Sequence, residues 1–168
     1  MYRPVPLVLV ATIMAFVAAS MGALAPIEVL FLGSFGLSGT LRGLVVSIPT
    51  LVSMVLSPFV VRAYRRWGFG VATALLALVP PSLLAMGAAR SASSYAAFKL
   101  GASSLWLVVP LLYAHVPALS DEVGLAYGLV VMGGSFGGMA GSLLSGLVAS
   151  YLDIRWSFML AAACSLLA

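Results

Sequence analysis

Two ionisable residues lie inside long apolar stretches of the sequence, where charged side chains are rare. Glu28 belongs to the stretch 6–32 and Lys99 to the stretch 95–117. An ionisable group inside a membrane helix costs ~2.5–3.5 kcal/mol on insertion scales, and such groups are commonly functional. Because the two have opposite charge and a similar depth near the outer ends of the expected helices, a Glu28–Lys99 pair is possible. The alternative is that both side chains extend to the outer membrane interface.

A set of polar and aromatic residues shares a helical face with Lys99. This residue is followed, in steps of four, three, four and three residues, by Ser103, Trp106, Pro110 and Tyr113. Such steps keep side chains on one side of an α-helix. A polar and aromatic face is typical of a cavity lining, so we expect a substrate and coupling cavity formed by Glu28, Lys99, Ser103, Trp106 and Tyr113. The alternatives are chance amphipathicity and anchoring of Trp106 and Tyr113 at the membrane interface.

Catalytic and metal-binding chemistry finds little support in the sequence. Gly36–Gly39 reads G-x-S-G, but Ser38 and the only histidine, His115, are expected on opposite sides of the membrane. That separation is too large for a nucleophile and its base. Metal and haem sites lack ligands, and a single cysteine, Cys164, excludes an intrachain disulfide. We therefore expect no enzyme, no metal and no cofactor. His115 is expected to face a loop at the interface, with proton coupling as its alternative role.

The composition indicates a lipid environment. Of 168 residues, 63% are hydrophobic and 7% are charged, against about 25% charged residues in soluble domains. The chain is interpreted as a single transmembrane domain, residues 1–168, because most of its apolar stretches have the ~20 residues that cross a bilayer. These stretches run approximately over 6–32, 43–61, 69–89, 95–117, 124–150 and 156–168. The last is too short to span, which indicates a fragment or half of a longer protein.

The distribution of arginines predicts the orientation. The cluster RAYRR, Arg62–Arg66, lies in a short connection, and basic residues favour the cytoplasmic side. With the N-terminus cytoplasmic, Arg3 lies on the same side as this cluster, opposite Arg42, Arg90 and Arg155. We expect a multi-pass protein of the cell membrane. The net charge of +4 is too dispersed for a nucleic-acid partner. The alternative for the N-terminus is a signal peptide cleaved after Ala23–Ala25.

The stretch 133–146, GGSFGGMAGSLLSG, repeats small residues every four positions. One stripe contains Gly133, Gly137, Gly141, Ser145 and Ala149, and an adjacent one contains Gly134, Gly138, Ser142, Gly146 and Ser150. The stretch is no phosphate-binding loop, because no lysine follows its glycines. Small residues at this spacing give a membrane helix a flat face that a neighbouring backbone can approach closely. This face either packs statically or is a surface on which two helix bundles slide.

Two short sequences recur in the same order. GLVV occurs at Gly43–Val46 and Gly128–Val131, and RWGF at Arg66–Phe69 is followed by RWSF at Arg155–Phe158. These echoes suggest two three-helix repeats, the second inverted because three is an odd number. Inverted repeats are typical of transporters. The expected fold is an all-α membrane protein with six transmembrane helices in two inverted repeats, half of a 12-helix transporter.

Several segments follow the order of motifs in a known family. SPFVVRAYRRWGFG is similar to a signature between helices 2 and 3, with matches at Pro58, Arg66 and Gly68, although Arg65 replaces its aspartate. Lys99 stands at the arginine position of a fourth helix. GGSFGGMAGS is similar to an antiporter motif in a fifth helix, matched at Gly133, Gly137 and Gly141. With FGLSGTLRGL and IRWSFML at two further helix junctions, the chain resembles the N-terminal six-helix half of a major facilitator superfamily transporter.

The resemblance implies secondary active transport of a small organic solute by alternating access, coupled to an ion, with protons as one coupling ion to test. In this family helices 1 and 4 line the central cavity. The expected partners are the lipid bilayer, the solute, and a C-terminal half or second copy. The residues implied in packing and gating are Gly133, Gly137, Gly141, Arg66 and Gly68. The alternative function is a non-catalytic, membrane-embedded subunit of a larger complex.

Overall fold

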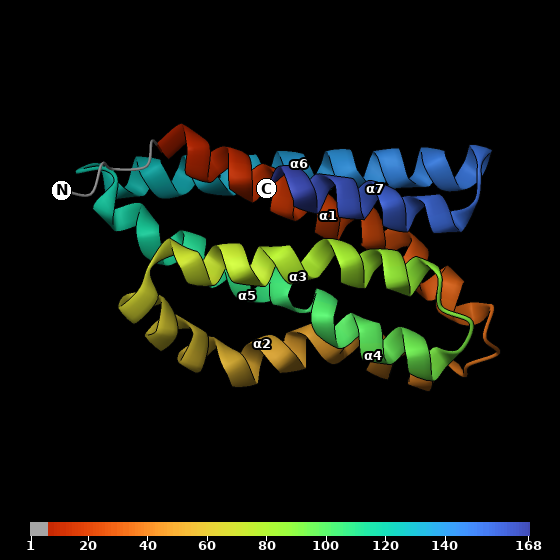
Figure 1. The fold of residues 1–168 in the computed structure, drawn as a ribbon. Helices are drawn as coiled ribbons and strands as arrows, with labels where there is room; N and C mark the ends of the chain where they lie inside the picture. The colour runs from red at the N-terminus through yellow and green to blue at the C-terminus, as the bar shows by residue number, and fades with distance from the viewer. Residues whose placement is uncertain (1–6) are drawn as a thin grey trace.

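The computed structural model describes residues 7–168, which are almost entirely helical (Figure 1). This part of the chain contains no strand. Its α-helices are α1 (Leu7–Gly33), α2 (Gly39–Trp67), α3 (Phe69–Gly87), α4 (Ala92–Ala102), α5 (Ser104–His115), α6 (Val123–Tyr151) and α7 (Ile154–Leu167), and the short 3-10 helix η1 is Val116–Ala118. The expectation of an all-α fold is confirmed. Arg3 and the expected helix start at Pro6 lie outside the described residues.

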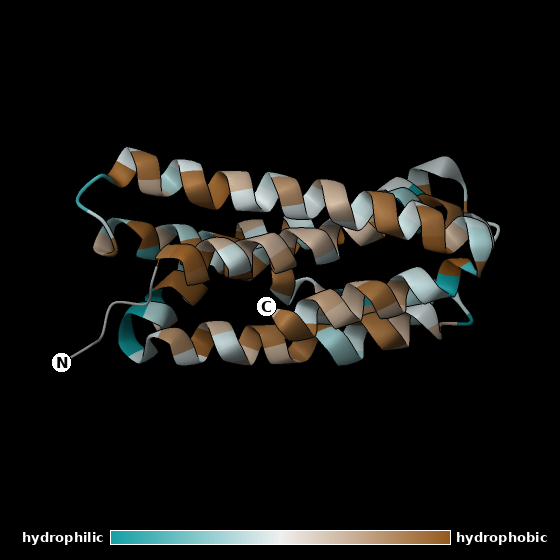
Figure 2. Ribbon diagram, turned by 90° about the horizontal axis from the view of Figure 1, so that it is seen from above, coloured by the Kyte–Doolittle hydropathy of each residue, from teal (hydrophilic) through white to brown (hydrophobic). Residues whose placement is uncertain are grey.

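The helices lie side by side, with their connections gathered at two ends of the bundle (Figure 1). Within residues 7–168, five stretches are long and apolar enough to cross a membrane, α4, α5 and η1 together forming one of them. α7 has 14 residues, or ~21 Å of helix. Hydrophilic residues are concentrated toward the two ends (Figure 2). These features define a helical, multi-pass membrane protein.

The helices alternate in direction. α1, α3 and α6 run one way along the bundle, and α2, α4, α5 and α7 run the other way (Figure 1). The connections 34–38, 88–91 and 152–153 therefore lie at one end. Gly68, η1 and the first turn of α1 lie at the opposite end.

α2 is longer than the stretch 43–61 that hydropathy predicts. It begins at Gly39, capped by the Ser38 hydroxyl, which accepts a hydrogen bond from the backbone N–H of Leu41 at 3.4 Å. It ends at Trp67, so the predicted basic connection is helical and carries Arg65 and Arg66 in its last turn. Hydropathy marks the hydrocarbon core, whereas a helix continues wherever its backbone hydrogen bonds can form.

The predicted fourth segment, 95–117, is not one continuous helix. It begins earlier, at Ala92, because Ser91 and Ser94 form a capping box. The helix is then interrupted at Ser103, between α4 and α5. The Ser103 hydroxyl donates to the Lys99 carbonyl oxygen at 2.7 Å, and the Ser104 hydroxyl to that of Gly101 at 2.8 Å. Serine hydroxyls that bond the preceding turn often bend helices.

α1 and α6 pack closely and in parallel through small residues. A Cβ on Gly137 would overlap the carbonyl oxygen of Ala15, and a Cβ on Gly141 would overlap that of Ala19. The hydroxyl of Ser145, the next residue in this stripe, donates to the Ala23 carbonyl oxygen at 2.6 Å. The expected close approach of a neighbouring backbone to this face is confirmed, and the neighbour is α1.

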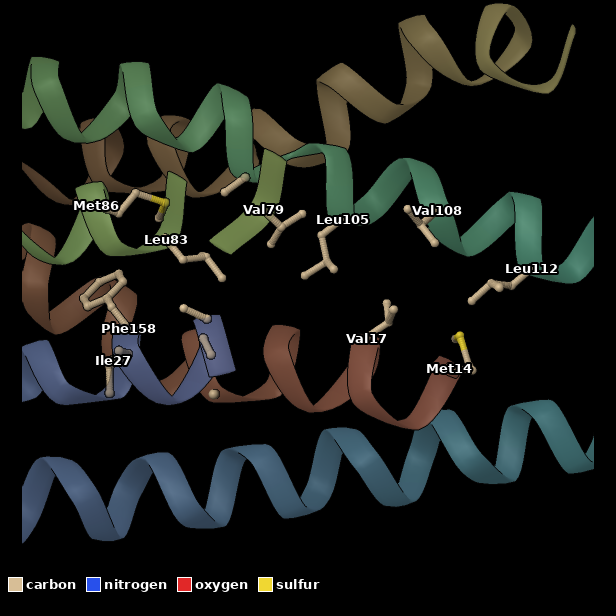
Figure 3. Close-up of a cluster of buried hydrophobic side chains, with 14 of the residues drawn as sticks. Met14, Val17, Ile27, Val79, Leu83, Met86, Leu105, Val108, Leu112 and Phe158 are labelled. Carbon is tan, nitrogen blue, oxygen red and sulfur yellow. The ribbon is translucent and has the colours of Figure 1, made fainter. Parts of the chain in front are cut away.

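The apolar core fills the space between α1 and α7 on one side and α3 and α5 on the other (Figure 3). Its side chains point toward one another from all four helices and include Met14, Val17, Ile27, Val79, Leu83, Met86, Leu105, Val108, Leu112 and Phe158. α2 contributes little to this core, because Pro49 is its one buried residue. The bundle therefore has a well-packed part and a loosely attached helix, α2.

Gly68 alone connects α2 to α3, and its backbone requires glycine. It has φ 63° and ψ −145°, a conformation that costs other residues ~1–3 kcal/mol. We expect Gly68→Ala to lower the midpoint of thermal unfolding in detergent. The control is Gly70→Ala, because a Cβ there meets nothing within 4 Å and alanine favours a helix. An equal response of the two variants would contradict this account of the junction.

Candidate functional site

A buried ion pair joins α1 to α4. The ammonium group of Lys99 contacts the Glu28 carboxylate, and the two side chains are only 4% and 9% exposed. The Tyr95 hydroxyl donates a hydrogen bond to the same carboxylate oxygen, Glu28 Oε1, at 3.0 Å. The possible Glu28–Lys99 pair is thus present, and the alternative of two side chains extended to the interface is wrong.

The helices explain why these groups meet. Tyr95 and Lys99 are four residues apart on α4 and therefore share one face. Lys99 lies about two turns inside α4 rather than one, because the capping box starts the helix earlier. Tyr95 is fully buried and its ring contacts that of Phe31, with centroids 5.6 Å apart. The ion pair is therefore closed off on this side by aromatic packing.

A cavity of about 190 Å³ lies beside the ion pair. Glu28 and Lys99 are its only charged lining residues in the described part of the chain. The remaining wall is apolar and comes from α1, α2, α3, α4 and α5: Met21, Leu24, Ala25, Val46, Pro49, Met86, Ala102, Leu105 and Trp106. The Trp106 side chain lies on the open side, where 43% of the residue is exposed. This arrangement can hold a small molecule against one positive and one negative group.

Two expected cavity residues lie elsewhere. Ser103 is completely buried, and its hydroxyl bonds the Lys99 carbonyl oxygen instead of facing the cavity. Tyr113 stacks on Tyr127, with ring centroids 6.0 Å apart, and its carbonyl oxygen accepts from the Tyr127 hydroxyl. For Tyr113 the interruption at Ser103 explains the difference, because a helical face extrapolated from Lys99 does not continue unchanged along α5.

His115 is not the loop-facing histidine that the sequence suggests. It lies in the last turn of α5, half-buried, with Nδ1 3.2 Å from the Tyr64 hydroxyl. Its ring also packs perpendicular to that of Phe69, at a centroid distance of 4.9 Å. These contacts tie α5 to the junction between α2 and α3, far along the bundle from Glu28 and Lys99.

The expected packing and gating residues occupy two separate regions. Gly133, Gly137 and Gly141 face the α1 backbone. Arg66 is exposed in the last turn of α2, where its guanidinium lies 5.7 Å from the ring centre of Trp67, and Gly68 forms the junction that follows. Neither region lines the cavity. No cluster of three His, Cys, Asp or Glu side chains that could hold a metal occurs within residues 7–168.

Sequence reasoning missed Tyr95, the third member of the charged cluster. Its spacing of four residues from Lys99 was the available signal, because a hydroxyl at that distance on a helix can reach the partner of the lysine. Phe158 was also missed. It comes from α7 and packs on Phe31 at a centroid distance of 5.0 Å.

The fold and this site define a class: a helical, multi-pass membrane protein with a buried ion pair on the wall of a small, mostly apolar cavity. Comparison of the chain with protein-family models, with curated proteins and with solved structures found no match.

Proposed function

We propose that the chain is an N-terminal half, or fragment, of a secondary active transporter of the major facilitator superfamily, moving a small organic solute by alternating access. The observation that carries the proposal is the cavity beside Glu28 and Lys99. Charged groups in the apolar part of a membrane protein are costly and are typical of substrate or ion pathways. Helices 1 and 4 of the resemblance correspond to α1 and α4–α5, which supply both charges.

The packing of the helices supports the inverted repeat within this proposal. If α1, α2 and α3 correspond to α4–α5, α6 and α7, a contact between two helices should recur between their two counterparts. α1 packs on α6 and α7, and correspondingly α4–α5 packs on α2 and α3. α3 and α7, which would exchange with each other, are also in contact. α1 packs much more closely on α6 than α4–α5 packs on α2, but the matching order of contacts is what an inverted repeat, a recurring feature of secondary transporters, would produce.

The exposed side of the bundle formed by α2 and Trp106 supports the proposal that a second wall completes the cavity. α2 exposes large apolar side chains such as Met54 and Phe59, at 78% and 64%, and Trp106 is half-exposed at the cavity. In the proposed transporter a C-terminal half or a second copy packs beside this side and completes the cavity, and lipid covers the remainder. Protons are the proposed coupling ion, as in many transporters that carry ionisable groups within the membrane.

Thiol accessibility tests alternating access without knowledge of the solute. Ala25 and Ala102 line the cavity, and Cys164→Ser, with serine in place of any cysteine outside residues 1–168, removes the native thiols. We expect Ala25→Cys or Ala102→Cys, in the full reading frame that contains this chain, to react with a membrane-impermeant reagent from either side of the membrane. Reaction in right-side-out vesicles alone, or in inverted vesicles alone, would favour the alternative of a static subunit of a complex.

The same vesicles need markers of sidedness. Ser38→Cys and Ser91→Cys mark one end of the bundle, and Arg66→Cys, at an exposed residue, marks the other. With the proposed cytoplasmic N-terminus, Ser38→Cys and Ser91→Cys react from outside and Arg66→Cys from inside. The reverse pattern would show that the N-terminus lies outside, and the access experiment could still be interpreted with the two sides exchanged.

A further inference from the structure

The charge balance of the cavity restricts what it can bind. Its wall carries one carboxylate, Glu28, and one ammonium, Lys99, and these neutralise each other. A bound organic anion would compete with Glu28 for Lys99 and leave one buried negative charge in excess. A bound organic cation would leave one buried positive charge in excess. Uncompensated buried charges are strongly unfavourable, so neither ion suits the site.

We propose that the cavity binds a small zwitterion with an apolar substituent, its carboxylate on Lys99 and its ammonium on Glu28. This inference rests on the proposed function, since it names the class of solute for the same cavity. A zwitterion inserts one negative and one positive group between the two side chains, so every buried charge keeps a partner. The site remains neutral before and after binding.

Tyr95 makes this exchange possible on the acidic side. Its hydroxyl already donates to Glu28 Oε1 at 3.0 Å. When Lys99 turns toward the ligand carboxylate, Glu28 keeps this hydrogen bond while it accepts from the ligand ammonium. The carboxylate is therefore held in position throughout, and the movable member of the pair is the flexible lysine.

The size and walls of the cavity select the substituent. Its volume of about 190 Å³ is below the roughly 300–1,000 Å³ of pockets for drug-sized ligands. Met21, Leu24, Met86 and Leu105 offer only apolar surface beside the ion pair. A short aliphatic or aromatic group fits this wall, whereas a polyhydroxylated solute would leave hydroxyl groups without partners.

A matched set of three compounds tests the proposal. Leucine carries both charges, 4-methylpentanoate lacks the ammonium group, and 3-methylbutylamine lacks the carboxylate, all with the same branched end. The full-length protein in nanodiscs, with Trp67→Phe, Trp156→Phe and phenylalanine in place of any tryptophan outside residues 1–168, reports binding through Trp106 on the cavity wall. We expect leucine to bind at least ~30-fold more tightly than either single-charge compound, as for removal of one partner of a buried charge pair. Equal affinities, or no binding of leucine, would overturn the proposal.

Two variants reverse the selectivity if the assignment of partners is right. Lys99→Met should make 3-methylbutylamine bind at least as tightly as leucine, and Glu28→Gln should do the same for 4-methylpentanoate. Leu144→Ile, on the exposed side of α6, is the control and should leave all three affinities unchanged. If a variant fails to fold, the comparison of the three compounds on the unsubstituted protein still decides.

The thiol-accessibility result separates this inference from the proposed function. If the cavity cysteines react from both sides of the membrane but leucine does not bind, the result would support a transporter and overturn the proposal of a zwitterionic ligand. If leucine binds but the cavity cysteines react from one side of the membrane only, the result would support a zwitterion-binding site and count against transport by alternating access.

Discussion

Replacing Gly137 by leucine should prevent α1 and α6 from packing. The Ala15 carbonyl oxygen already lies where the first carbon of any side chain would go, and that oxygen belongs to the backbone, which cannot rotate away. The two helices would have to separate, and this would break the hydrogen bonds that the Ser142 and Ser145 hydroxyls donate to the α1 carbonyl oxygens of Gly22 and Ala23, at 3.0 Å and 2.6 Å. We expect a loss of ~3 kcal/mol or more in the free energy of unfolding, the upper part of the range for overpacking.

Gly128→Leu is the matched control for this experiment. It makes the same change in the same helix, at a glycine where an added Cβ would meet nothing within 4 Å. A second control, Leu144→Ile, alters a side chain that is 48% exposed. Thermal unfolding in detergent, followed by size-exclusion chromatography, should show a large drop for Gly137→Leu and small shifts for both controls. Similar midpoints for the two leucine substitutions would mean that the glycine face meets lipid.

This contact also bears on whether α6 slides against α1. Gly133, Gly137 and Gly141 alternate with α1 carbonyl groups at matching four-residue intervals, and serine hydroxyls extend the same row. A sliding step of one turn would place Ser145 opposite Ala19, where a Cβ on glycine already has no room. The contact therefore favours static packing between these two helices, and the proposed motion belongs to other surfaces.

The glycine face could be predicted from sequence because its cause is local. Small residues every four positions in a membrane helix allow a neighbouring backbone to approach closely, and this property can be read from the spacing alone. The partner was not predictable in this way. α1 offers Ala11, Ala15 and Ala19 at the same spacing, yet alanine is common in all apolar helices and so marks none of them.

The charged pair could be predicted in part, for a different reason. Only two ionisable residues lie well inside apolar stretches, and the cost of leaving either alone in lipid favours their pairing. The rest of the site depends on the direction of each side chain after the interruption at Ser103. Ser103, with ψ −17°, ends α4, and α5 begins at the next residue. A hydropathy pattern does not encode this local change of backbone angle, which alters the direction of the side chains that follow. Tyr113 was therefore assigned to the wrong surroundings, while Trp106, much closer to the interruption, does line the cavity.

The largest energetic effect expected at the site comes from separating the members of the ion pair. Lys99→Met removes the only cation that contacts Glu28 within residues 7–168, and the carboxylate keeps a single hydrogen bond, from Tyr95. Glu28→Gln leaves the Lys99 ammonium facing an uncharged amide. Each single substitution should cost ~3–5 kcal/mol of stability, because it leaves one charge buried without its counter-ion.

The double variant, Glu28→Gln with Lys99→Met, should be more stable than either single variant, because it leaves no charge behind. The side chains differ little in volume, and the Tyr95 hydroxyl can still donate to the glutamine oxygen. The measurement is a double-mutant cycle of thermal unfolding in detergent on the full-length protein, with transport or leucine binding followed in parallel. Small and additive single effects would show that solvent reaches both groups. If the double variant is instead much more stable than the sum of the two single effects predicts, the pair holds α1 against α4. If leucine binding is also lost in all three variants, the same two side chains are the contacts for the ligand.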